Sequence, residues 1–523
     1  MEFLCNVSWV KLGCLFTSTR FFFLRFYRSF VLRANSFILQ VIYFISLSLI
    51  GFGLLGILKP RSSEPIRSLD LLFTSVSAAT VSSMSTVEME AFSNAQLVVL
   101  TVLMFVGGEV FTSMVGLHLR NHRLRLLPKT ADKVASVDSD ALSVRSANHA
   151  DDGIVDCIEL GVSQTSRPFR SDDCDYLRYL SVKFLSSVVL VYLVAVQAIG
   201  VAMVSIYLKV FSGARKLLED KGLKLLTFSV FTTVSTFASC GFVPTNENMA
   251  VFGRDSALLL ILIPQVLLGN TLFPSCLRLI LWVLGRWCSG HGAETSYLLK
   301  SSPEIGYLHL LPRLHSLLLV ATVFGFVGVQ FALFSAMQWS SDALSGLVGP
   351  YEKIVAVLFQ CVNTRHTGET VVDFSKLAPA VLVLFTVMMY LPPYTSFLGG
   401  DGGCPPSHPE RPDKPVRIRG KVVENLVFSQ LSYLAIFVIL VCITERANME
   451  KDQLNFNVGY GNVGFTMGYS CGRQLQPSAA CRDKWFGFAG RWSDGGKVVL
   501  MVVMVFGRLK KFNMNGGRGW KLL

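Results

Sequence analysis

The chain has 523 residues, of which 51% are apolar and 16% are charged, and its net charge is +13. A soluble protein carries roughly 25% charged residues, so this chain has too little charge to cover a water-facing surface, and one unit inside a bilayer is favoured over several soluble domains. The basic residues lie beside apolar runs without aromatic interleaving, which excludes nucleic acid as a partner.

Both ends of the chain are basic. The first 35 residues hold five Lys and Arg residues against Glu2, and the tail from Arg508 onward is basic without an acid. Positive charge next to a membrane span marks the cytoplasmic side. Both termini are therefore predicted to be cytoplasmic.

Long apolar runs predict eight membrane spans. The run 37–58 carries no charge, and its 22 residues are enough to cross a hydrocarbon core of roughly 30 Å. In chain order the runs are 37–58, 97–119, 184–208, 257–277, 317–337, 377–391, 426–444 and 498–506. An even number of spans fits two cytoplasmic termini.

Shorter apolar segments alternate with these spans, at 71–83, 225–241, 351–368 and 454–464. Each ends at a small residue followed by polar ones, and most are too short to cross, which indicates re-entrant loops. The first two look like copies, because the residues 73–77 (FTSVS) and 231–235 (FTTVS) fall at equal offsets from Ser83 and Gly241. The predicted fold is an all-α integral membrane protein with four membrane–pore-loop–membrane repeats around a central pore.

The domain boundaries follow from this pattern. The predicted order is a basic N-terminus 1–35, repeat A 36–120, a cytoplasmic loop 121–178, repeat B 179–285, a cytoplasmic loop 286–312, repeat C 313–396, a cytoplasmic loop 397–421 and repeat D 422–523.

The last residues of the four loops are the candidate ion site. A pore must replace the water shell of an ion, and backbone at membrane depth is tolerated where it lines a cavity. A single small residue after an apolar segment is usually a turn, but four at matching places indicate a ring. The four ring residues are Ser83, Gly241, Gly368 and Gly464.

Acidic residues follow the ring residues. Glu88, Glu247 and Glu369 come shortly after the first three of them. Acids at a pore mouth concentrate cations, whereas for any one of them alone an ordinary solvated loop is the better explanation. We expect these three acids at the outer mouth.

Three further residues carry open alternatives. Arg508, at the end of the last span, either faces the pore or extends to the lipid headgroups. Cys471 and Cys481 follow the fourth loop and form either a disulfide or two free thiols. Catalytic and cofactor motifs are missing from the sequence, so we expect neither an enzyme nor a cofactor, and sodium at the ring is the one metal ion expected.

The segments 75–90, 228–249, 363–369, 460–469 and 487–492 resemble the plant high-affinity potassium transporter (HKT) family of the Trk/Ktr superfamily. The resemblance implies that the ring is a selectivity filter. It also implies that a Ser at the first position makes the transporter sodium-selective, and that Arg508 forms a constriction below the ring. The plasma membrane is the family's usual location.

One departure from the family concerns the fourth loop, where only five residues separate Leu454 from Tyr460. A pore helix of about a dozen residues is expected there and is missing. The predicted function is a sodium uniporter in contact with the bilayer, with a homodimer as a further expectation. The alternatives are a sodium–potassium symporter, a potassium transporter, or a non-conducting variant.

Overall fold

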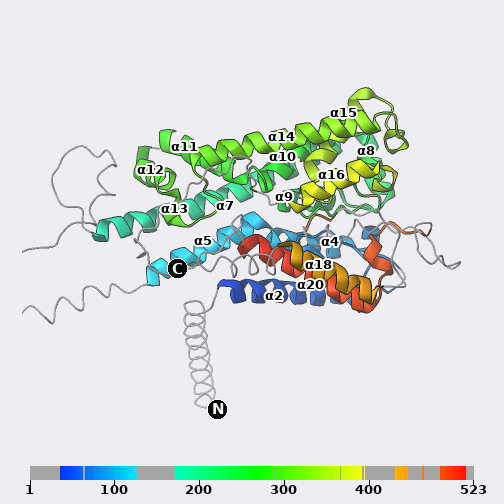
Figure 1. The fold of residues 1–523 in the computed structure, drawn as a ribbon, viewed down its shortest axis with the longest axis horizontal. Helices are drawn as coiled ribbons and strands as arrows, with labels where there is room; N and C mark the ends of the chain where they lie inside the picture. Colours follow the sequence, from blue (N-terminus) through cyan, green and yellow to red (C-terminus); the bar gives the residue numbers. More distant parts are fainter. Residues whose placement is uncertain are drawn as a thin grey trace, which may run out of the picture.

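The computed structural model describes residues 36–62, 65–126, 171–287, 289–365, 367–391, 394, 430–445, 462–464, 471 and 483–513. Within these ranges the secondary structure is helical, without a β-strand. Most of the helices lie roughly along one direction, which is horizontal in Figure 1.

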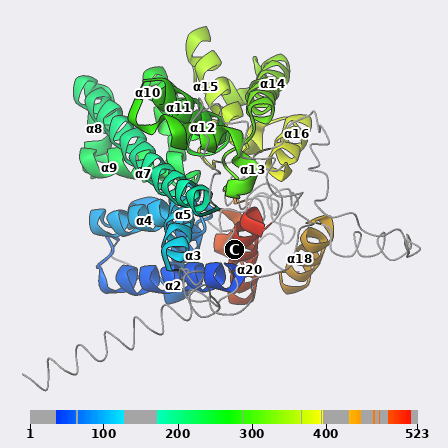
Figure 2. The same cartoon turned by 90° about the vertical axis from the view of Figure 1, so that its left-hand side faces the viewer.

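The helices fall into four groups in chain order. The first two groups are α2 (Ser36–Ile57), α3 (Ser68–Ala79), α4 (Asn94–Gly107) and α5 (Glu109–Leu126), then α7 (Ser171–Val210), α8 (Ser212–Asp220), α9 (Leu225–Ala238), α10 (Ser256–Gly269) and α11 (Phe273–Trp287). After α12 (Gly292–Lys300) and α13 (Ser302–Ile305) come α14 (Arg313–Gln338), α15 (Pro350–Asn363) and α16 (Pro379–Tyr390), followed by α18 (Gln430–Thr444) and α20 (Asp494–Asn513). Seen along the helices in Figure 2, the four groups follow one another around a common centre. Neighbouring groups touch where α4 packs on α9, α10 on α15 and α20 on α3.

Three of the described helices, α2, α7 and α14, are long and apolar enough to cross a membrane, and the count rises to five if each bent pair is one span. The bent pairs are α4 with α5, at 55°, and α10 with α11, at 81°. The runs 97–119 and 257–277 were each predicted as one span, so each of these is a helix pair with a break.

Both breaks lie against the end of a shorter helix. Gly107 ends α4, and a Cβ there would overlap the carbonyl oxygen of Ala79 in α3. Gly269 ends α10, and a Cβ there would overlap the carbonyl oxygen of Phe237 in α9. Glycine therefore lets each span approach the end of the loop helix that precedes it.

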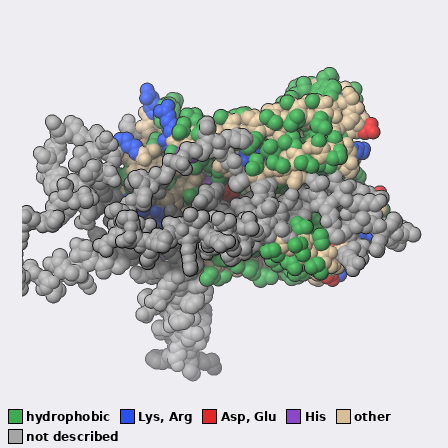
Figure 3. Space-filling model, viewed as in Figure 1, with side chains coloured by type: hydrophobic (Ala, Val, Ile, Leu, Met, Phe, Trp, Pro, Cys, Tyr) green, Lys and Arg blue, Asp and Glu red, His purple; other side chains and the backbone are tan. Residues whose placement is uncertain are grey.

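The outer faces of the long helices are apolar and exposed. Ile50 of α2 is 60% exposed, Val191 of α7 is 66% exposed, and Leu317 of α14 is 60% exposed. Figure 3 shows hydrophobic side chains over the helical part of this face. An apolar surface of this extent calls for an apolar surrounding, as a bilayer provides.

Two segments that were predicted as loops contain helical residues in the structure. The segment 286–312 contains α12 and α13, and Leu298 of α12 and Ile305 of α13 are both buried in the core. The predicted loop 121–178 is shorter at both ends, since α5 continues to Leu126 and α7 begins at Ser171. The remainder of that loop, the segment 395–429 and the shortened stretch 454–461 lie outside the described residues.

Candidate functional site

The structure brings the four ring residues together, and all of them line one cavity. A Cβ on Gly241 would overlap the backbone nitrogen of Gly368. A Cβ on Gly464 would overlap the hydroxyl of Ser83, and so would one on Gly368. The four loop ends are thus in close contact, with room for one side chain among them.

Three of the loops share a backbone pattern in which the ring residue and the residue two before it have positive φ. The pairs are Val81 (51°) with Ser83 (45°), Ser239 (60°) with Gly241 (90°), and Asn462 (52°) with Gly464 (87°). In the third loop the corresponding residue 366 lies outside the described part of the chain. Left-handed backbone at alternate residues turns successive carbonyl groups toward one side, so each loop can present a row of oxygens to a cation.

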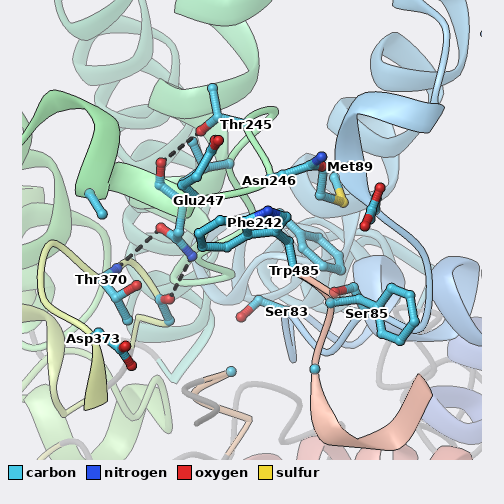
Figure 4. A pocket seen from close by; sticks show the side chains of 18 of the residues that line it. Ser83, Ser85, Met89, Phe242, Thr245, Asn246, Glu247, Thr370, Asp373 and Trp485 are labelled. Atoms are coloured by element: carbon cyan, nitrogen blue, oxygen red, sulfur yellow. Dashed lines mark hydrogen bonds between the residues drawn. The ribbon is translucent and has the colours of Figure 1, made fainter. Parts of the chain in front are cut away.

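Ser83 is the one ring residue with a side chain. It is 8% exposed, and its hydroxyl has no hydrogen-bond partner among the described residues. Figure 4 shows this hydroxyl pointing into the space between the loops. A positive φ is uncommon for a residue other than glycine. The Ser83 side chain is therefore held on a strained backbone among the four loop ends.

The first two loops are closed by corresponding serines, although the donor lies one residue later in the first loop. The Met84 N–H donates to Ser77 Oγ at 2.8 Å, and the Gly241 N–H donates to Ser235 Oγ at 3.1 Å. Ser77 and Ser235 are each six residues before the ring residue. The two segments that look like copies in the sequence thus have equivalent roles.

The fourth loop is held by Asn462, which is fully buried. Its Nδ2 donates to Ser82 Oγ at 2.6 Å and to the Met504 carbonyl at 3.1 Å. These bonds join the fourth loop to the first loop and to α20. Sequence reasoning missed this residue, although Asn is among the few residues that tolerate a positive φ.

Asn248 supports the third loop and was also missed. Its Nδ2 donates to the Gly368 carbonyl at 3.3 Å, and its Oδ1 accepts from the Thr370 N–H at 3.1 Å. Asn248 itself has a φ of 56°. An Asn in a loop is a signal for such a conformation, but its partner lies more than a hundred residues away in the chain.

The cavity above the ring, which we call the vestibule, has a volume of about 790 Å³. Glu88 and Glu247 line it, as expected for acids at a mouth. Glu369 differs from that expectation, because it is fully buried and does not line the vestibule. Its carboxylate accepts a hydrogen bond from the Thr236 hydroxyl of α9, which holds it behind the ring. Asp373, labelled with Glu247 in Figure 4, also lines the vestibule.

Arg508 is directed into the protein. Its side chain is 1% exposed, and its guanidinium donates to the carbonyl of Gly107 and lies 5.9 Å from the centre of the Phe44 ring. Gly107 is the last residue of α4 before the break, where a carbonyl loses its partner within the helix. Arg508 satisfies that carbonyl from another group of helices. Of the two alternatives, extension to the lipid headgroups does not fit this position.

The position that Arg508 occupies in α20 has a counterpart after the last glycine of α4 and α10. The helices α4 and α10 have 14 residues each and end at Gly107 and Gly269. The fourteenth residue of α20 is Gly507, and the helix continues through it. Arg508 therefore corresponds to Asn270, which follows the glycine in the second group.

The predicted disulfide falls partly outside the described residues. Cys471 is disulfide-bonded. Cys481 lies outside the described part, so its pairing with Cys471 stays a prediction.

Comparison with known proteins gives a consistent set of relatives. Residues 158–400 match the TrkH family, described as a cation transport protein. Cation transporter HKT1;3 of Oryza sativa subsp. japonica is 45% identical over 507 residues, covering 94% of this chain and 92% of that protein. Sodium transporter HKT1 of Arabidopsis thaliana is 44% identical over 496 residues, covering 90% and 91%. Among solved structures, the potassium transporter TrkH of Vibrio parahaemolyticus is 17% identical, with a TM-score of 0.49, and the match covers 91% of this chain and 84% of that one.

Proposed function

The chain belongs to the plant HKT cation transporters, and we propose that it passes sodium passively across the membrane through the ring of Ser83, Gly241, Gly368 and Gly464. Its relatives are named cation and sodium transporters, and with its long apolar helices the chain is accordingly a multi-pass membrane transporter and not an enzyme. The preference for sodium and the passive flux are proposed here, and they go beyond the cation transport that the family shares.

We take the four groups of helices as four repeats, each made of a span, a re-entrant loop and a span. Their order around a common centre supports this layout, as do the equivalent Ser77 and Ser235 bonds. The boundaries are those expected from the sequence, with α12 and α13 added to the segment 286–312. In this layout the ring is the selectivity filter, and each repeat contributes one residue.

The observation that carries the sodium assignment is the side chain of Ser83. Its hydroxyl has no partner in the part of the chain that the structure describes and lies over Gly368 and Gly464, so it can face an ion. It also narrows a ring whose other members have no side chain. Potassium is the larger ion and needs the wider, more symmetric ring, whereas sodium fits a smaller one with an added oxygen.

Charge along the path supports cation flow. Glu88 and Glu247 line the vestibule and would raise the local concentration of cations. Arg508, buried at the break after Gly107, would repel cations below the ring and so act as a constriction. We place the vestibule on the outer side and both termini in the cytoplasm, with the plasma membrane as the location and a homodimer as the assembly.

The test is a comparison of sodium and potassium currents in a cell without cation currents of its own. Ser83→Gly should raise the permeability of potassium relative to sodium by about tenfold, since a filter distinguishes ions by size and ligand field. Ser85→Gly is the matched control, because Ser85 lines the same vestibule two residues beyond the ring.

Each alternative gives a different result in this recording. A symporter needs both ions for full current, and a potassium transporter carries potassium alone. A sodium preference that Ser83→Gly leaves unchanged would remove Ser83 as the selectivity determinant.

A further inference from the structure

Lys221 joins two acids at the rim of the vestibule. Its Nζ lies 2.6 Å from Glu90 Oε1 and 2.7 Å from Glu247 Oε2. Glu90 follows the first ring residue and Glu247 follows the second, so one ammonium bridges the segments beyond two ring residues. The three side chains are between 18% and 31% exposed, and Glu247 lines the vestibule (Figure 4).

The triad is held from several sides. The Arg61 guanidinium donates to the Lys221 carbonyl at 2.5 Å. The Asn246 N–H donates to Glu90 Oε1, and the Glu90 N–H donates to Asn246 Oδ1, each at 3.1 Å. Partial burial lowers the pKa of Lys221, but its bonds to Glu247 and Glu90 together outweigh this, so that its pKa is raised and the ammonium stays charged.

The same carboxylates would suit a divalent cation. Both oxygens lie within 2.7 Å of one nitrogen, so they are at most about 5 Å apart. Calcium binds carboxylate oxygens at 2.3–2.6 Å, close to these nitrogen–oxygen distances. Two carboxylates around one ion at a pore mouth would hold a divalent cation more tightly than sodium.

We infer that Lys221 is a tethered cation that fills this carboxylate pair and so keeps divalent cations from binding at the rim of the vestibule. The triad would then contribute one negative charge to the mouth, where two bare carboxylates would contribute two. The inference deepens the proposed function and rests on it for any effect on flux. The occupancy of the pair by Lys221 can be measured without transport.

The test measures calcium binding to the purified full chain in lipid nanodiscs, by titration calorimetry at constant sodium concentration. Lys221→Met should gain one calcium site at least about tenfold tighter than any site of the unmodified protein. Lys221→Arg should bind like the unmodified protein, because it restores the positive charge. Lys221→Met combined with Glu90→Gln should lose the new site.

Lys376→Met is the matched control. Lys376 lines the same vestibule, and the described residues show no ion pair for it, so its loss removes a charge without freeing a carboxylate pair. Lys221→Gln is the second variant in case Lys221→Met is not monodisperse.

Three results would overturn the inference. The first is calcium binding by Lys221→Met and Lys221→Gln that equals that of the unmodified protein, and the second is an equal gain in Lys376→Met. The third is a new site that persists when Glu90 is also replaced.

The calcium block of sodium current adds a second measurement, with a stronger block expected in Lys221→Met. A gained calcium site in a chain that carries no current would support the role of Lys221 and count against sodium transport. The two measurements thereby distinguish a failure of the role inferred for Lys221 from a failure of the proposed sodium transport.

Discussion

The second and fourth loops bring their glycines to the ring by different bonds. In the second loop Ser239, two residues before the ring, accepts a hydrogen bond at 3.0 Å from Asn270, which lies at the break of the following span. In the fourth loop Asn462 has the place of Ser239, and it is the donor, to the carbonyl of Met504 in α20. In both loops the residue two before the ring is tied to the span that follows.

The spans themselves differ after the same glycine. The second is bent by 81° at Gly269, whereas α20 continues unbroken through Gly507. Asn270 at the break bonds its own loop, and Arg508 in the unbroken helix reaches the break of another span at Gly107. The residue after this glycine thus bonds to its own loop in the second repeat and to the break of another span in the fourth.

Lengthening the fourth loop should have the largest effect on sodium current, because it would give that loop a pore helix like the one in the second loop. The missing dozen residues correspond to up to roughly 18 Å of helix, whose C-terminal end would direct partial negative charge at the ion. We expect the chain as it stands to conduct sodium only weakly. Inserting an apolar helical stretch of about a dozen residues between Val458 and Tyr460 should raise the current by about tenfold or more.

This comparison requires recordings at matched surface expression of the two proteins. An insertion of equal length made of Gly and Ser is the control, since it adds chain without helix. Robust sodium-selective current from the unmodified chain would contradict the prediction and would mean that three pore helices suffice.

Removing the anchor of the fourth loop should have the next largest effect. Asn462→Ala leaves the buried Ser82 hydroxyl and the Met504 carbonyl without this donor, which costs about 1–3 kcal/mol of folding free energy. Thermal unfolding of the purified protein measures it. Asn462→Gly separates the lost bonds from the positive φ, because glycine accepts that backbone. Equal stability of Asn462→Ala and the unmodified chain would show that the loop is held elsewhere.

Neutralising Arg508, which follows Gly507 in α20, should have an intermediate effect, on sodium conductance. Arg508→Gln removes the positive charge and keeps a hydrogen-bond donor for Gly107, so sodium conductance should rise roughly fivefold as repulsion falls. Single-channel recording measures this, with Arg508→Lys as the control that retains the charge. Equal currents in Arg508→Gln and the unmodified protein would exclude Arg508 as the constriction.

The corresponding change in the second repeat should have the smallest effect. Asn270→Ala removes one hydrogen bond, to Ser239, and costs about 1 kcal/mol. The side-chain oxygen Oδ1 of Asn270 has no partner among the described residues, so its loss costs nothing further. A double-mutant cycle with Ser239→Ala isolates the bond. A larger loss of stability than in Asn462→Ala would reverse the order proposed for the two loops.

The long helices α2, α7 and α14 could be predicted from apolar runs, because a span needs about 20 apolar residues whatever it packs against. The breaks within the spans were harder to predict. The breaks after Gly107 and Gly269 depend on the close approach of α3 and α9, and the first of them also on the bond from Arg508. Contacts of that kind join distant parts of the chain and leave no periodic pattern.

The candidate site shows the same limit. The meeting of the ring residues could be expected from the repeated loops, although their role as a filter stays a prediction. The burial of Glu369 could not be expected, since its partner Thr236 is 133 residues away in α9. Lys221 was missed for a similar reason, because Glu90 is 131 residues from it and only the folded chain brings them together.

The ring is made from one chain, and this has a genetic consequence. Where four identical subunits surround a pore, a mutation in one codon alters every wall at once. Here a codon specifies a single wall, and Ser83 can be exchanged while Gly241, Gly368 and Gly464 are inherited unchanged. The serine codons AGT and AGC differ from glycine codons by one base. A gene that encodes Ser83 by either of them is one point mutation away from a ring without side chains, so under the role proposed for Ser83 the ion preference would change in a single step.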